Sequence, residues 1–160
     1  MILKGLISED FVNYKKPSMT LMFPYCIGFK CGTGYCQNVS LGQEKIIEIS
    51  VDSLVKRYIN NPITEAVVMQ GLEPFDSWND MFEFIFKLRE VCLDDIVIYT
   101  GYNKDEIVDK VDELAQFKNV IIKFGRYIPN QERHFDEVLG VYLASDNQYA
   151  ERIINEGKSN

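Results

Sequence analysis

The sequence lacks several features that would mark particular classes of protein. Its 160 residues contain one histidine, His134, which lies in a polar stretch that we interpret as a surface loop. No window reaches the roughly 18 uncharged apolar residues that a membrane span needs, so we expect no membrane association. The first ten residues also lack the basic and apolar regions of a signal peptide. We therefore expect a cytoplasmic protein without histidine-based catalysis.

Positive charge is also scarce. The chain has 17 Lys and Arg against 24 Asp and Glu, which gives a formal net charge of -7. Its only basic dipeptide, Lys15-Lys16, is best explained as part of a solvated loop. Proteins that bind nucleic acid use clustered Lys and Arg to release phosphate counterions. We therefore expect no nucleic-acid partner.

The composition indicates one globular domain over residues 1–160. Hydrophobic residues make up 46% of the chain and charged residues 26%, which is ordinary for a folded domain with a substantial core. No repeat, linker or low-complexity segment divides the sequence. Four cysteines in a cytosolic chain are expected to be thiols or metal ligands rather than disulfides.

The pattern of apolar residues predicts an α/β fold. Four continuous apolar runs predict strands buried on both faces, as in a parallel sheet: 20–23, 66–69, 96–99 and 120–124. Helical patterns alternate with these runs, which indicates βαβ units. A closed eight-stranded barrel needs roughly 200 residues or more. The chain is therefore expected to form a parallel-sheet partial (β/α) barrel that is open on one side.

The expected helices begin at candidate caps. Asp52 precedes a helix that should end near residues 60–62, and Ser77 with Asp80 resembles a capping box before a second amphipathic helix. A third apolar stripe follows Asp105. We expect the tail to add a short strand and a terminal helix, and we interpret 145–148 as a helix start.

The most informative segment is a loop with three cysteines. Cys26, Cys31 and Cys36 fall within eleven residues, directly after the apolar run 20–23. Thiolate is a soft ligand that favours iron-sulfur clusters, zinc or copper(I). Glycines in the loop would let the three sulfurs converge: Gly28, Gly32 and Gly34. Three protein ligands leave one metal position open, which indicates chemistry rather than a purely structural role.

Structural zinc is the alternative for this loop. Zinc in such sites normally takes four Cys or His ligands, and the remaining candidates, Cys92 and His134, lie far away in sequence. Cys92 lies on the apolar face of an expected helix, so we interpret it as a thiol of the core.

Unusual residues also follow the other expected strands. Parallel α/β folds place their sites at the carboxyl ends of strands. Gly71 and Glu73 follow the second strand, Gly101 and Tyr102 the third, and 125–127 the fourth. The carboxylate of Glu73 and nearby main-chain carbonyls could accept hydrogen bonds from an ammonium group. The alternative is that Gly71 to Pro74 is only a turn between strand and helix.

These residues together resemble the radical S-adenosylmethionine superfamily, and within it the small activating proteins of anaerobic (class III) ribonucleotide reductase. The resemblance rests on the cysteine loop and on a series of segments in the same order: Tyr35, Gln37-Asn38, Gly71-Leu72-Glu73-Pro74, Tyr99-Thr100-Gly101-Tyr102, Gly125-Arg126-Tyr127-Ile128 and Ser145-Asp146-Asn147-Gln148. It covers most of the chain.

The resemblance implies a specific chemistry. Cys26, Cys31 and Cys36 would ligate a 4Fe-4S cluster whose fourth iron is chelated by S-adenosyl-L-methionine. Reductive cleavage would give a 5'-deoxyadenosyl radical, which abstracts a hydrogen from a glycine of a partner glycyl-radical enzyme. A flavodoxin or ferredoxin would be the expected reductant. A partial barrel open on one side would admit a loop of the protein substrate.

The resemblance also implies how the cofactor would be bound. Glu73 and the backbone of Gly71 would hold the methionine ammonium, and Tyr35 would lie near the adenine. Gly101 and Tyr102 would complete the cofactor-binding residues.

The sequence departs from the family pattern at several positions. The family usually places fewer residues between its cysteines, whereas here each interval holds four. Extra loop residues cost little entropy, so the cluster is expected to persist. Leu72 replaces a glycine, and Phe124 stands where an acidic residue is common. Lys123 beside it is a candidate contact for a carboxylate.

Two other functions fit the sequence. The first is a radical S-adenosylmethionine enzyme that acts on a small molecule without a protein partner. The second is a non-catalytic iron-sulfur or zinc module that binds a partner. Formation of 5'-deoxyadenosine and dependence on a partner enzyme would discriminate among the three.

Overall fold

The computed structural model describes residues 1–27 and 36–156. Its main feature is a six-stranded sheet in the order β10, β7, β6, β5, β3, β2. The strands are β1 (Ile2–Leu3), β2 (Gly5–Asp10), β3 (Ser18–Phe23), β4 (Ile47–Glu48), β5 (Ala66–Gly71), β6 (Asp95–Tyr99), β7 (Val120–Phe124), β8 (His134–Asp136), β9 (Val141–Leu143) and β10 (Tyr149–Ile153). The α-helices are α1 (Val39–Gly42), α2 (Val51–Ile59), α3 (Trp78–Arg89) and α4 (Val108–Leu114), and the 3-10 helices are η1 (Pro74–Ser77) and η2 (Lys104–Glu106).

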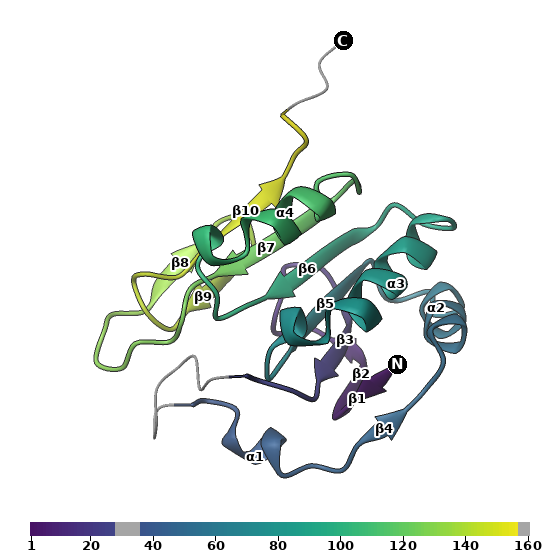
Figure 1. The fold of residues 1–160 in the computed structure, drawn as a ribbon, viewed down its shortest axis with the longest axis horizontal. Helices are drawn as coiled ribbons and strands as arrows, with labels where there is room; N and C mark the ends of the chain where they lie inside the picture. The colour runs from purple at the N-terminus through teal and green to yellow at the C-terminus, as the bar shows by residue number, and fades with distance from the viewer. Residues whose placement is uncertain (28–35, 157–160) are drawn as a thin grey trace.

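The four strands expected from the sequence form the centre of this sheet. They correspond to β3, β5, β6 and β7, and neighbouring members pair in parallel. The outer strands β2 and β10 pair antiparallel with β3 and β7, so the sheet is mixed. Figure 1 shows the helical layer of α3 and α4 in front of the sheet, with β8 and β9 beside its β10 end. The curvature of a partial barrel stays a prediction.

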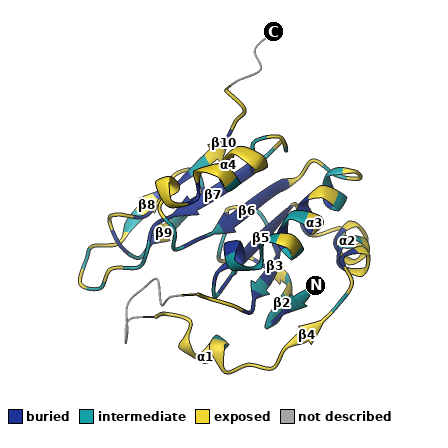
Figure 2. Cartoon of the chain, viewed as in Figure 1, coloured by how far each residue is buried: buried dark blue, intermediate teal, exposed yellow. Residues whose placement is uncertain are grey.

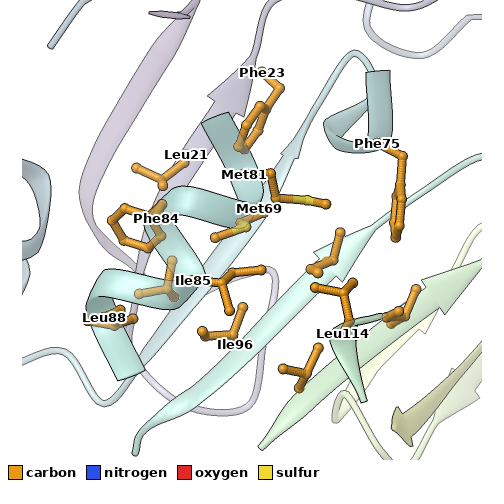
Figure 3. Packing of buried hydrophobic residues seen from close by; sticks show 14 of the residues in the cluster. Leu21, Phe23, Met69, Phe75, Met81, Phe84, Ile85, Leu88, Ile96 and Leu114 are labelled. Carbon is orange, nitrogen blue, oxygen red and sulfur yellow. The ribbon is translucent and has the colours of Figure 1, made fainter. Parts of the chain in front are cut away.

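The sheet is buried on both faces, as continuous apolar strands require. Side chains of one parity, such as Met69 and Ile96, pack against Met81, Ile85 and Leu88 of α3 (Figure 3). Side chains of the other parity pack on the opposite face, where the core is made of residues from the strands and two connecting segments: Tyr14, Ala66, Val68, Val97, Ile121, Leu139, Leu143 and Ala150. Figure 2 shows the central strands in dark blue and the outer faces of the helices in yellow. Packing on both faces therefore holds the central strands, and with them the positions of their carboxyl ends.

One predicted helix cap is wrong, and a second lies at the predicted residue without a capping hydrogen bond. The side chain of Ser50, rather than Asp52, accepts the hydrogen bond from Ser53 N at the start of α2, at 3.1 Å. Ser77 is the N-cap residue of α3, as predicted, but its side chain makes no capping hydrogen bond. Instead, the carboxylate of Glu73 accepts the N–H of Phe75 at the start of η1.

The tail also differs from expectation. Residues 145–148 form a turn rather than a helix start, in which Gln148 Oε1 accepts the N–H of Ser145 at 3.2 Å. The turn leads into β10, and the described residues up to 156 contain no helix after this strand. His134 lies at the start of β8 instead of in a loop. The tail therefore closes the sheet as an antiparallel edge strand.

Within the described residues, every helix is too short or too polar to cross a membrane.

Candidate functional site

A cavity of about 590 Å³ lies where the parallel strands end, a size typical of small-molecule sites. Its lining comes from the last residues of β5, β6 and β7, from the segments that follow β3, β5, β6 and β7, and from two more distant residues. The lining residues are Asn13, Cys26, Cys36, Gln37, Asn38, Val39, Gly42, Gln70, Gly71, Leu72, Glu73, Tyr99, Thr100, Gly101, Lys123, Gly125, Tyr127 and Gln148. The convergence expected from a parallel sheet is therefore present.

Two of the three predicted cluster ligands line this cavity. Cys26 and Cys36 are exposed thiols, and the backbone N–H of Asn38 donates to Cys36 Sγ at 3.4 Å. Hydrogen bonds to the sulfurs of an iron-sulfur centre tune its reduction potential. Cys31 and Tyr35 lie outside the described residues. In residues 1–27 and 36–156 no three Cys, His, Asp or Glu side chains group as a metal site, so a three-cysteine site requires Cys31.

Glu73 is a buried carboxylate at the wall of the cavity. Its side chain accepts three hydrogen bonds, from Thr100 Oγ1 at 2.8 Å, Gly101 N at 2.9 Å and Phe75 N at 3.2 Å. Burial raises the pKa of Glu73 above its ordinary value, against the lowering effect of these three donors, and the nearby charge of Asp76 raises it further. The residue therefore joins the turns after β5 and β6 and places a carboxyl group beside the cavity.

Gly71 has a backbone that only glycine adopts readily. Its φ is +106°, and a Cβ at this position would lie 2.6 Å from Phe23 N. Phe23 O in turn accepts the N–H of Leu72 at 3.1 Å. The glycine is therefore needed where the chain leaves β5 and passes close to the end of β3. This close approach brings the turn beside the first residues of the cysteine loop.

Both ends of the cysteine loop are bound to the turn after β5. Before the loop, Ile27 N donates to Asp76 Oδ2 at 2.6 Å. After it, Asn38 Nδ2 donates to Gly71 O at 2.8 Å. The two hydrogen bonds span 49 and 33 residues of sequence. The described residues next to Cys26 and Cys36 are thus held against the same strand end.

Gly101 and Tyr102 occupy different places. Gly101 lines the cavity and donates its N–H to Glu73, whereas Tyr102 is absent from the described lining and donates its hydroxyl to Asp76 at 2.7 Å. Burial and the hydrogen bond to Asp76 raise the pKa of Tyr102, with further contributions from the charges of Glu73 and Cys26. The tyrosine therefore stays protonated and acts as a donor beside the cysteine loop.

Among the described residues that line the cavity, Lys123 is the one with a cationic side chain. It is 6% exposed, and its ammonium donates to Gly125 O at 3.0 Å and Thr100 O at 3.3 Å. The ammonium also lies 5.8 Å from the ring centroid of Tyr99. A buried cation and the carboxyl of Glu73 in one cavity can receive opposite ends of a zwitterion.

The sequence did not identify Asp76 and Asn13 as residues of the site. Asp76 follows the Glu-Pro pair by two residues, and no local pattern distinguishes it from an ordinary solvated acid. Asn13 precedes β3 in the chain and reaches the cavity because its carbonyl accepts the hydroxyl of Tyr99 at 2.6 Å. Both positions depend on long-range contacts.

The fold and the cavity together define an α/β protein with two exposed thiols at the wall of one cavity. Residues 19–148 match the model of the 4Fe-4S single cluster domain family. The chain belongs to this family. The matched range includes all three loop cysteines and the carboxyl ends of β3, β5, β6 and β7.

No curated protein and no solved structure matches the chain.

Proposed function

We propose that this protein is a radical S-adenosylmethionine enzyme whose 4Fe-4S cluster is held by Cys26, Cys31 and Cys36. The observation that carries the proposal is that Cys26, Cys36 and Glu73 line one cavity at the ends of parallel strands. The exposed thiols fit a cluster, because soft thiolates are the usual ligands of iron-sulfur centres. The cavity also has the size of a small-molecule site beside the cysteines.

The polar residues of the cavity fit an amino-acid cofactor. A carboxylate offers about four acceptor positions, and three donors reach Glu73, so one position is left for an ammonium. Lys123 provides a buried positive charge for a carboxylate in the same cavity. These residues would bind and orient the methionine part of S-adenosyl-L-methionine. When bound, the cluster and this cofactor together supply a 5'-deoxyadenosyl radical after one-electron reduction.

We further propose a glycyl-radical enzyme of the anaerobic ribonucleotide reductase type as the substrate. Support comes from two segments that resemble the activating proteins, 99–102 and 125–128. Tyr99, Thr100 and Gly101 of the first segment, and Gly125 and Tyr127 of the second, border the same cavity as the cysteines. A flavodoxin or ferredoxin is the proposed electron donor.

The first test is anaerobic reconstitution with iron and sulfide, followed by dithionite reduction and electron paramagnetic resonance with and without S-adenosyl-L-methionine. We expect a reduced-cluster signal that shifts when the cofactor is added, together with formation of 5'-deoxyadenosine. A cluster that does not respond to the cofactor would contradict the proposal and favour a non-catalytic iron-sulfur module.

The substrate is tested in a second reaction. The reduced protein and S-adenosyl-L-methionine are mixed with an anaerobic ribonucleotide reductase, and the glycyl radical is measured by electron paramagnetic resonance. A glycyl-radical doublet supports the proposed partner. Formation of 5'-deoxyadenosine with a small molecule, but no radical on the reductase, would instead favour a small-molecule substrate.

A further inference from the structure

The carboxylate of Asp76 makes two contacts beside the cysteine loop. Asp76 Oδ2 accepts the N–H of Ile27 at 2.6 Å, and Oδ1 accepts the hydroxyl of Tyr102 at 2.7 Å. Ile27 directly follows Cys26, so the first bond fixes a peptide group adjacent to a proposed cluster ligand. Hydrogen bonds to an ionised acceptor are roughly twice as strong as neutral ones. A single side chain therefore orients the start of the loop.

Asp76 is itself held by the fold rather than by the loop. It lies in η1, which begins at Pro74 directly after the Glu73 turn. Its second partner, Tyr102, packs the edge of its ring against Phe75, with centroids 6.5 Å apart. The carbonyl of Tyr102 accepts the N–H of Gly125 at 3.0 Å. The turns after β5, β6 and β7 thus form a rigid support for the Asp76 carboxylate.

We infer that Asp76 is a positioning residue for Cys26, acting through the Ile27 amide and supported by the Tyr102 hydroxyl. This inference rests on the proposed function, because it takes Cys26 as a cluster ligand. A ligand next to a fixed peptide group loses less conformational entropy when it binds metal, which favours retention of the cluster. Asp76 is not among the described residues that line the cavity, so its effect is on the geometry of the Cys26 ligand.

The substitution Asp76→Asn distinguishes the effect of the two hydrogen bonds of Asp76 from the effect of its negative charge. An asparagine can accept the Ile27 N–H through its carbonyl oxygen and donate to the oxygen of Tyr102 through its amide, so both contacts can persist. Asp76→Ala removes both contacts. If the hydrogen bonds matter, the alanine variant should lose its cluster faster than the wild type, and the asparagine variant should lose it at nearly the wild-type rate. If only the negative charge matters, the two variants should behave alike.

Asp80 provides a matched control. Its Oδ2 also accepts a backbone N–H, from Ile2 at 3.0 Å, and it lies in the first turn of α3 close to Asp76 in sequence. The segment that it holds is the N-terminus, far from the cysteines in sequence. Asp80→Ala therefore removes a bond of the same kind without touching the loop.

The experiment measures the release of iron from the reconstituted protein to a chelator, in the wild type and in the three variants. Loss of hydrogen bonds to a charged acceptor predicts release about tenfold faster in Asp76→Ala, and within about twofold of wild type in Asp76→Asn and Asp80→Ala. Equal release from Asp76→Ala and Asp80→Ala overturns the inference. Equally fast release from Asp76→Asn and Asp76→Ala also overturns it, in favour of a charge effect.

A second measurement on the metal-free protein keeps this inference separate from the proposed function. Amide hydrogen exchange should become faster at Ile27 in Asp76→Ala and at Ile2 in Asp80→Ala, each without change at the other site. If the wild type takes up no iron, the proposed function fails, and exchange alone decides whether Asp76 fixes the peptide beside Cys26. If exchange at Ile27 is the same in Asp76→Ala as in the wild type, Asp76 does not fix this peptide group and the inference is wrong.

Discussion

Thr100 donates its hydroxyl to the carboxylate of Glu73 at 2.8 Å, and this buried bond joins two turns that lie 27 residues apart. Glu73 is 1% exposed, so few water molecules can solvate its charge. The three donors around it offset only part of the cost of burial, since the pKa of Glu73 remains raised. The Glu73 carboxyl group, which the proposed cofactor would contact, is thus fixed in an environment that disfavours its charged form.

Glu73 should make the metal-free protein less stable as the pH rises. A raised pKa means that the folded state binds the proton more tightly than the unfolded chain. This contribution to the free energy of unfolding is fully present below the unfolded pKa, which is 4.5 for the ordinary side chain, and is lost as the pH rises through the folded pKa. Urea unfolding between pH 4 and 8, at roughly half-unit steps, measures the change.

Glu73→Gln is the control for that measurement, because glutamine does not titrate. The difference in unfolding free energy, wild type minus variant, should fall with rising pH. Subtracting the variant removes the contribution of the other carboxyl groups. A difference that rises with pH would show that the pKa of Glu73 is lowered rather than raised.

Gly71→Ala should destabilise the protein strongly. The residue has a φ of +106°, and the added Cβ would lie 2.6 Å from the backbone nitrogen of Phe23. Backbone strain of this kind costs about 1–3 kcal/mol, and the contact with a buried strand adds to it. The expected result is a lower urea midpoint in the metal-free protein.

Gly42→Ala is the matched control for this substitution. A Cβ on Gly42, at the end of α1, would meet nothing within 4 Å. We expect a change within about 0.5 kcal/mol, as for most surface substitutions. If both alanine variants unfold at the same urea concentration, the close approach of Gly71 to β3 is not a constraint.

The sequence predicts the centre of the fold because its signal is local there. Runs such as 66–69 and 120–124 are apolar at every position, and only strands covered on both faces need that pattern. The antiparallel strand β10 carries no such run, because Tyr149 and Arg152 are exposed and Glu151 is only half-buried. Strands β8 and β9 have three residues each, too few for a periodic signal. Their places in the fold are set by long-range contacts.

The same distinction applies to the site. Glu73 and Gly101 could be predicted because the carboxyl ends of parallel strands meet at one edge. Asp76 could not, since its bond to Ile27 crosses 49 residues and leaves no pattern in either segment. The N-cap of α2 is Ser50 rather than the predicted Asp52. Serine and aspartate both suit an N-cap position, so residue type alone does not distinguish them.

Asp95→Asn should destabilise the protein at neutral pH. The Asp95 carboxylate accepts hydrogen bonds from Tyr14 at 2.9 Å, Lys16 at 2.8 Å and Arg152 at 3.0 Å. Asparagine keeps one acceptor oxygen and loses the charge, so we expect a loss of about 1–3 kcal/mol in the free energy of unfolding. Asp52→Asn removes a carboxylate that is 78% exposed and bound to Lys87, and should change stability by less than about 1 kcal/mol.

The effect of Asp95 on pH dependence has the opposite sign to that of Glu73. Burial alone would raise the pKa of Asp95, but the hydrogen bonds from Lys16, Arg152 and Tyr14 bring it below the ordinary 3.8. Its stabilisation is present above that unfolded value and is lost as the pH falls through the folded pKa. Acid unfolding of wild type and Asp95→Asn should therefore converge as the pH falls below 3.8. Curves that stay parallel there would contradict a lowered pKa.

Cys36→Ala should abolish the iron-sulfur cluster, whereas Cys92→Ala should keep it. Cys36 lines the cavity, and its sulfur accepts the N–H of Asn38. Cys92 packs at the edge of the core, its sulfur accepts the N–H of Asp94 at 3.3 Å, and burial raises the pKa of its thiol. A raised pKa disfavours the thiolate that binds metal, so Cys92 is a poor ligand even when it is reached by iron.

The measurement is iron and sulfide content with visible absorbance after anaerobic reconstitution of both alanine variants. Each variant removes one thiol, so a general loss of sulfur ligands cannot explain a difference between them. Cys92→Ala is expected to lose about 1 kcal/mol of stability from lost packing, yet retain the iron content of the wild type. Full iron content in Cys36→Ala, or its loss in Cys92→Ala, would mean that the cluster is bound by a different set of sulfurs.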